Sequence, residues 1–244
     1  MITTAWRLPD APLRASAVAT HLVALLAVAA LATAARSSLP VGAFYAAKAS
    51  AAFAALMLLS LGFLQRHHPF TRFGPANQVT TARAVVVSLI AGLVGEMPLP
   101  ALATGAVAAS VVATLLDGVD GWLARRHAIA SDFGARFDME VDALLILTLS
   151  LLAWTFGKAG AWVIASGAMR YAFAAAGARW SWLQAPLPES RRRQMVCVVQ
   201  VAALTIVLVP TVPPSICAPI AAAALLMLTW SFLIDTLWLF RRAH

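Results

Sequence analysis

Long runs of apolar residues, separated by short polar segments, make up most of this chain of 244 residues. A helix needs about 20 predominantly apolar residues to cross a lipid bilayer. Eight windows approach that length, at 16–35, 43–64, 77–95, 101–124, 134–157, 161–178, 194–212 and 217–239. The pattern therefore predicts an all-α integral membrane protein with eight transmembrane helices.

Composition agrees with this prediction, because 61% of the residues are hydrophobic and only 11% are charged, which excludes an ordinary soluble domain. The net charge of +8 would suggest nucleic acid binding in a soluble protein. In a membrane protein, the side on which the basic residues lie matters more than their total.

The basic residues are distributed unequally between the two sides of the predicted membrane domain. If the N-terminus is cytoplasmic, the same side receives Arg7, Arg14, Arg66, Arg72, Arg125, Arg126, Arg179, Arg191, Arg192, Arg193, Arg241 and Arg242. The opposite loops hold only Arg36 and Lys158. The asymmetry predicts a multi-pass protein of the cell membrane with both termini cytoplasmic, and no nucleic acid partner.

A string of acidic and small residues spans the fourth and fifth windows in the pattern D-x2-D-G-x2-A-R-x8-G-x3-D-x3-D. Its members are Asp117, Asp120, Gly121, Ala124, Arg125, Gly134, Asp138 and Asp142. Residues three or four apart share a helix face, so the spacing places two pairs of carboxylates on two successive helices. Each charge at the centre of a membrane helix costs roughly 2.5–3.5 kcal/mol unless it is compensated. Oxygen ligands of this kind suit Mg²⁺ or Mn²⁺, and two such ions suit displacement at phosphorus.

At these positions the chain resembles the CDP-alcohol phosphotransferase family, whose signature is filled at every specified position. The resemblance implies a membrane enzyme that moves a phospho-alcohol from CDP-diacylglycerol or another CDP-alcohol to a hydroxyl acceptor in phospholipid biosynthesis, releasing CMP. It also implies two Mg²⁺ or Mn²⁺ ions and a homodimer. The resemblance is compatible with several acceptor alcohols.

The resemblance also implies roles for the signature residues. Asp117, Asp120, Asp138 and Asp142 are the expected metal ligands, and Asp142 is the expected catalytic base for the acceptor hydroxyl. Asp117, Gly121, Ala124 and Arg125 are expected to contact the nucleotide. Small side chains at Gly121 and Ala124 also suit simple helix packing, and Gly134 is expected to let the fifth helix approach the fourth.

A second stretch, Asn77 to Arg83, resembles the N-x-x-T-x-x-R opening of the family's first core helix. Asn77 and Thr80 lie one helical turn apart and are expected to contact the nucleotide, while Arg83 can meet a phosphate or a carboxylate. The resemblance divides the chain into residues 1–76, with two additional N-terminal helices and an interfacial linker, and residues 77–244, a six-helix catalytic core. The cytoplasmic position of the acidic string predicts an active site that faces the cytoplasm.

Basic residues of the sixth and seventh windows are candidates for binding the acceptor. Arg170 lies inside an apolar window, where an unpaired charge is expensive, and Arg191 and Arg193 mark the start of the next one. The arginine triplet also fits a topogenic charge cluster, and Asp235 in the last window has no assigned role.

One function of another class also fits an intramembrane acidic cluster. Carboxylates inside a membrane line ion and proton pathways, so the alternative is a cation or proton transporter. That alternative leaves Gly121, Ala124, Arg125 and Gly134 without an explanation.

Overall fold

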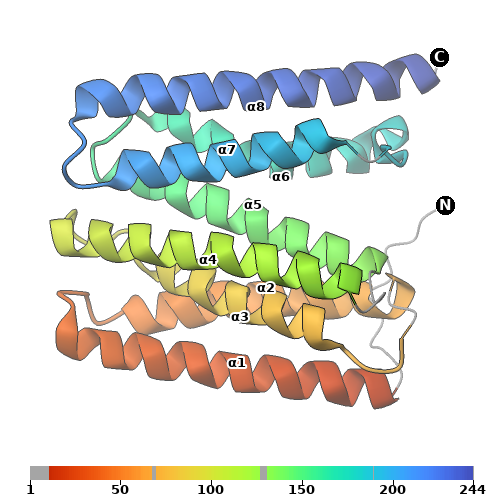
Figure 1. Ribbon diagram of the computed structural model, residues 1–244, viewed down its shortest axis with the longest axis horizontal. Coiled ribbons are helices and arrows are strands. Elements are labelled where there is room, and N and C mark those ends of the chain that lie inside the picture. The colour runs from red at the N-terminus through yellow and green to blue at the C-terminus, as the bar shows by residue number, and fades with distance from the viewer. Residues whose placement is uncertain (1–10, 68–69, 127–130, 189, 244) are drawn as a thin grey trace. The chain divides into compact units, whose positions relative to one another are not determined.

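The structure is a computed structural model that describes residues 11–67, 70–126, 131–188 and 190–243 (Figure 1). Within these ranges, the side chains of residues 11, 63, 65–67, 122, 124 and 125 lie outside the description. The described residues form helices and connecting turns, without a strand. The elements are α1 (Ala11–Ser38), α2 (Tyr45–His67), α3 (Pro75–Gly92), α4 (Pro100–Arg126), α5 (Asp132–Thr155), η1 (Ala161–Ile164), α6 (Ala165–Arg179), η2 (Ser181–Gln184), α7 (Arg191–Leu208) and α8 (Pro214–Ala243).

Each of the eight predicted windows coincides with a helix, so the all-helical prediction is confirmed over the described residues. Four segments among those residues are long and apolar enough to cross a membrane: Pro12–Ser38, Tyr45–Gly62, Pro100–Gly121 and Pro214–Ala243. The prediction of eight crossings is not confirmed. The remaining helices are more polar or shorter: α3 opens with polar residues, α5 and α7 open with charged ones, and α6 has only 15 residues.

Apolar side chains on the surface of the long helices fit a lipid environment. In α1, Val23 and Leu26 are 68% and 70% exposed, and Leu226 of α8 is 71% exposed. Soluble monomers rarely expose continuous apolar faces, whereas membrane helices present them to lipid.

The chain forms two compact units, each of which is described by itself. The first contains residues 1–96 and 108–142, and the second contains residues 97–107 and 143–244. In the first unit, α1 and α2 pack against each other and both pack against α3 (Figure 1). The predicted functional division at residue 76 stays a prediction.

Polar contacts tie the start of α2 to the end of α3. The Tyr45 hydroxyl donates to the carbonyl oxygen of Leu89 at 3.0 Å, and Lys48 Nζ donates to the carbonyl of Val94 at 2.9 Å and to Glu96 Oε1 at 2.5 Å. Lys48 thereby satisfies a carbonyl at the C-terminal end of α3, where cations are favoured. Burial opposes ionisation of Glu96, but hydrogen bonds from Lys48 and from the Gly42 backbone N–H outweigh it and lower the pKa of Glu96.

An aromatic cluster joins α1 to the segments around the acidic string. The ring of His21 lies 5.1 Å from that of Phe73 and 6.1 Å from that of Phe137, and Phe133 stacks on Phe137. His21 is buried, and its Nε2 lies 2.7 Å from the hydroxyl oxygen of Ser60 on α2. Phe137 is the residue before Asp138, so this contact brings α1 against the turn of α5 that carries a predicted metal ligand.

In the second unit, α7 packs along α8, and α6 approaches the second half of α5. The approach requires a glycine, because a Cβ atom added at Gly167 would lie 2.2 Å from Leu147 Cα. Lys158 Nζ donates to the carbonyl oxygens of Val209, Pro210 and Val212 at 3.0, 3.3 and 2.7 Å. It satisfies carbonyl groups after the C-terminus of α7, as Lys48 does after α3.

Candidate active site

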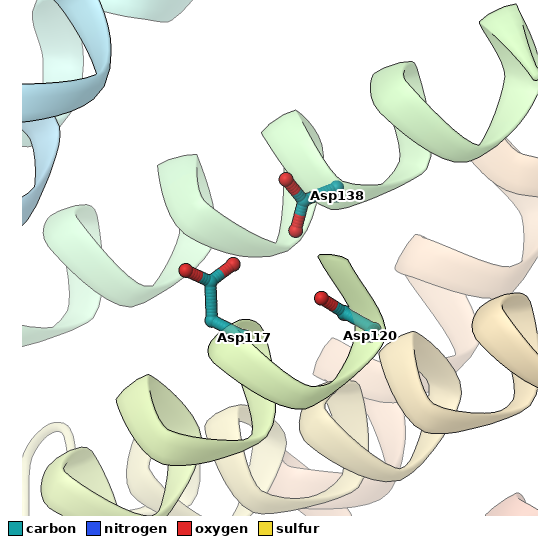
Figure 2. Close-up of side chains that lie close together, drawn as sticks. All are labelled: Asp117, Asp120 and Asp138. Carbon is teal, nitrogen blue, oxygen red and sulfur yellow. The ribbon is translucent and has the colours of Figure 1, made fainter. Parts of the chain in front are cut away.

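Two helices of the first unit carry the acidic side chains, and a third contributes basic and polar ones. Asp117 and Asp120 lie one turn apart near the end of α4, and Asp138 and Asp142 lie one turn apart near the start of α5. Figure 2 shows the carboxylates of Asp117, Asp120 and Asp138 pointing toward one another from the two helices. The helical spacing read from the sequence therefore produces the predicted convergence of these three groups.

The geometry of the three carboxylates fits a divalent cation. One ligand oxygen from each of Asp117, Asp120 and Asp138 lies within 4.8 Å of the other two. Asp120 is buried, whereas the side chains of Asp117 and Asp138 are 39% and 37% exposed. An oxygen-only donor set with partial access suits Mg²⁺ or Mn²⁺ rather than a soft metal.

The guanidinium group of Arg83 connects the whole acidic string. Its Nη1 donates to Asp117 Oδ1 at 2.6 Å, to Asp138 Oδ1 at 2.5 Å and, more weakly, to Asp120 Oδ2 at 3.3 Å. Its Nη2 donates to Asp142 Oδ1. Asp142 thus joins the same cluster through Arg83, and we call Arg83 with the four aspartates the acid cluster.

Charge in the acid cluster is strongly unbalanced. Arg83 is fully buried and supplies one positive charge against four carboxylates, which leaves a formal charge of −3 when all four are ionised. Buried charges persist only when they are paired and hydrogen-bonded. The excess of negative charge therefore makes these carboxylates attractive to a divalent cation.

Two residues predicted to contact a nucleotide border the acid cluster on α3. Thr80 is buried, and its hydroxyl lies 2.9 Å from Asp120 Oδ2 and 3.1 Å from the carbonyl oxygen of Ala76. Asn77 is also buried, and its amide donates to the carbonyl oxygen of Phe73 at 2.5 Å. Their nucleotide contacts stay predictions.

Gly134 allows α5 to approach α3 closely. A Cβ atom added at Gly134 would lie 3.1 Å from Asn77 Oδ1, which is tighter than ordinary contact. The close neighbour of Gly134 is therefore Asn77 of α3. The sequence analysis had instead predicted a close approach to the preceding helix, α4. Gly121 lies on α4 one residue after Asp120 and is half-buried, while the side chains of Ala124 and Arg125 lie outside the described residues.

The predicted acceptor-binding arginines belong to the second unit. Arg170 lies on α6 and is half-buried, and Arg191 is exposed at the start of α7. Arg193 donates to the carbonyl oxygen of Pro188 and lies 3.7 Å from Asp235. Binding of the acceptor by these three residues stays a prediction.

Two contacts in the structure exceed what the sequence indicated. Arg83 was expected to meet a phosphate or a carboxylate, and it contacts four carboxylates at once. Asp235, which had no assigned role, accepts a hydrogen bond from Arg192 at 2.5 Å, and Arg192 also donates to the Ser231 hydroxyl at 2.5 Å. The available signal for this pair was that Asp235 is the sole acidic residue of α8.

Apolar helices long enough to cross a membrane, together with converging carboxylates, define a helical membrane protein with a candidate cation site. A sequence model of the CDP-alcohol phosphatidyltransferase family matches residues 73–235, more than half of the chain, and the chain belongs to this family. The predicted resemblance is thereby confirmed, and membership implies transfer of a phospho-alcohol from a CDP-alcohol in lipid synthesis. No curated protein and no solved structure matches the chain significantly.

Proposed function

We propose that the protein transfers a phosphatidyl group, or a related phospho-alcohol, from CDP-diacylglycerol or a similar CDP-alcohol to a hydroxyl acceptor, and releases CMP. The observation that supports this proposal most is the convergence of the signature aspartates of α4 and α5. Converging carboxylates in a membrane helix bundle can hold the divalent ions that stabilise charge during phosphoryl-group transfer.

Two divalent ions, Mg²⁺ or Mn²⁺, are the proposed cofactors. Asp117, Asp120 and Asp138 would hold them, with Asp142 at the edge of the site. When bound, the ions would neutralise the pyrophosphate of the donor and stabilise the departing phosphate.

The proposed reaction uses Asp142 as the base. The hydroxyl oxygen of the acceptor forms a bond to the β-phosphorus of the CDP-alcohol, the bond from that phosphorus to the bridging oxygen breaks, and CMP leaves with the bond's electron pair. The hydroxyl proton passes to a carboxylate oxygen of Asp142. Positioning of the two reactants supplies much of the rate enhancement in such a reaction.

Nucleotide recognition is assigned to groups around the acid cluster. We assign the cytidine and its phosphates to Asn77, Thr80, Gly121, Ala124 and Arg125, with Asp117 at the boundary between nucleotide and metal. Thr80 supports this assignment because its hydroxyl lies beside Asp120. Small residues at Gly121 and Ala124 permit close approach of a ligand to the α4 backbone.

The proposed acceptor contacts are Arg170, Arg191 and Arg193. Guanidinium groups bind phosphate oxygens in pairs, so these residues favour an acceptor that carries a phosphate. Eight membrane crossings, cytoplasmic termini, an active site facing the cytoplasm and a homodimer complete the proposal. The one-sided distribution of arginine supports the orientation.

An acceptor screen tests the proposed function directly. The purified full-length protein is given CDP-diacylglycerol, Mg²⁺ or Mn²⁺ and a panel of phosphorylated and plain alcohols, and CMP and the lipid product are measured by mass spectrometry. We expect metal-dependent release of CMP together with one new phosphodiester. Cation flux in reconstituted vesicles without nucleotide turnover would instead support the transporter.

A matched pair of variants tests the role of Asp142. Because loss of a catalytic base typically slows a reaction about 10²–10⁴-fold, we expect a decrease of that size in Asp142→Asn. Glu140→Gln is the control, since it removes a neighbouring carboxylate of α5 that lies outside the signature. Undiminished turnover in folded Asp142→Asn would exclude Asp142 as the base.

A further inference from the structure

Arg83 occupies the position in the acid cluster from which a cation would contact the carboxylates. Its Nη1 alone lies within 3.3 Å of oxygens from Asp117, Asp120 and Asp138, the three residues whose oxygens are grouped closely enough for a metal ion. The guanidinium and a divalent ion would therefore use the same ligands.

We propose that Arg83 is the built-in counter-ion of the acid cluster, and that a divalent cation has to displace its guanidinium group from the carboxylates in order to bind. The inference rests on the proposed cation site and adds a competing cation that belongs to the chain itself. Its consequence is that Arg83 weakens cation binding while it stabilises the cluster without cations.

Distances support competition rather than joint occupancy. A magnesium ion bound at about 2.1 Å to Asp117 Oδ1, which lies 2.6 Å from Arg83 Nη1, would be at most about 4.7 Å from that nitrogen. Two cationic centres at such a separation repel each other, most strongly where water is scarce. To bind the ion, the carboxylate oxygens must also give up the hydrogen bonds that they accept from Arg83.

Burial explains why the chain carries this arginine. Arg83 is shielded from water, and its guanidinium group donates hydrogen bonds to all four aspartates. Four neighbouring carboxylates without a cation would repel one another and force α4 and α5 apart. The guanidinium prevents this, because its planar group donates to several carboxylates simultaneously.

Cation binding to an arginine variant provides the test. The binding of Mn²⁺ to the purified full-length protein is measured by electron paramagnetic resonance of the free ion, without any nucleotide. We expect Arg83→Gln to bind Mn²⁺ at least tenfold more tightly than the wild type, because a competing positive charge has been removed. Unchanged or weaker binding would overturn the inference.

Two further variants keep the test decisive. Arg83→Lys retains the charge but offers a compact ammonium that reaches fewer carboxylates, so its affinity for Mn²⁺ should lie between those of the wild type and Arg83→Gln. Arg192→Gln is the control, because it removes an arginine that pairs with Asp235 in the second unit, and its affinity should equal that of the wild type. If Arg83→Gln fails to fold, an affinity of Arg83→Lys no tighter than that of the wild type overturns the inference.

The same preparations separate this inference from the proposed function. Tighter Mn²⁺ binding by Arg83→Gln in a protein that turns over no CDP-alcohol would support the inference and contradict the transferase. Metal-dependent turnover by a wild type whose Mn²⁺ affinity is insensitive to Arg83 would support the transferase and overturn the inference. Absence of Mn²⁺ binding in both proteins would overturn the inference as well.

Discussion

Two charged residues of the first unit, Arg83 and Lys48, differ in how far they are buried. Arg83 is fully buried among aspartates, whereas Lys48 is about one-third exposed and pairs with Glu96 in a connecting segment. Removing one partner of a buried ion pair costs about 3–5 kcal/mol, whereas a pair with one partly exposed partner, such as Lys48–Glu96, is screened by water and contributes less. Arg83 is therefore the more sensitive of the two positions, and Lys48 matters mainly for joining α2 to α3.

The contact between Lys48 and Glu96 makes a stability contribution that depends on pH. The pKa of Glu96 lies below its ordinary value of 4.5 in the folded protein, because the hydrogen bonds from Lys48 and Gly42 outweigh the effect of burial. A lowered pKa stabilises the folded state above the ordinary value, and the contribution disappears as the pH falls through the folded-state pKa. We expect Glu96→Gln to lower the unfolding temperature at neutral pH and to have little effect well below pH 4.5.

Thermal unfolding of the two proteins in detergent, followed by tryptophan fluorescence over a pH series, measures this difference. A gap in unfolding temperature that stays constant across the acidic range would contradict the assigned role of the carboxylate. Lys48→Met provides a matched check, because it removes the partner and should produce the same trend.

Helices position these residues through close contacts at small side chains. Gly92 on α3 lies against Tyr45 of α2, Gly134 on α5 lies against Asn77 of α3, and Gly167 on α6 lies against Leu147. Membrane helices associate largely through packing, so small residues permit their backbones to approach. The contact at Gly134 is the one that brings α5 to the helix carrying Arg83.

Gly167 is the position at which this packing is least tolerant of a larger residue. A Cβ atom there would lie 2.2 Å from Leu147 Cα, and a backbone atom cannot move aside as the end of a side chain can. We expect Gly167→Ala to destabilise the protein by about 1–3 kcal/mol or more, the range for overpacked cores.

Gly105 offers the matched control on α4, since nothing lies within 4 Å of a Cβ atom added there. Gly105→Ala should be neutral, or stabilising by up to about 1 kcal/mol through helix propensity. The comparison is made by measuring the unfolding temperatures of the two variants in the same detergent. Equal values would show that α6 can move away from Leu147 at little cost in stability.

Helix positions could be predicted from the sequence because apolar length is a local property. All eight windows coincide with helices, and their ends differ by a few residues, as in α1 and α8, where polar or aromatic residues extend the helix beyond the apolar window. The spacing of Asp117, Asp120 and Asp138 also predicted their common cluster. Arg83 at its centre could not be derived, because its partners lie on two other helices and depend on how three helices pack.

At the scale of the whole molecule, the family match and the compact units have different boundaries. The match begins at residue 73, yet the first unit includes α1 and α2 together with the acid cluster. His21 of α1 stacks on Phe137, and its ring also contacts Phe73. The N-terminal helix α1 thus packs against the turn of α5 that carries Asp138, although α1 lies outside the matched region.

Removing residues 1–72 should therefore damage the acid cluster although it leaves the family match intact. The truncated chain loses His21, which contacts Phe73 and Phe137, and Tyr45, which donates to the Leu89 carbonyl. It also exposes side chains of α3 that α1 and α2 cover. We expect it to bind Mn²⁺ more weakly and to unfold at a lower temperature than the full chain. Co-expression of residues 1–72 as a separate fragment should restore both properties, because the effect arises from packing rather than from chain connectivity. A truncated chain that retains the full chain's affinity and unfolding temperature would show that the acid cluster is held in place by residues 73–244 alone.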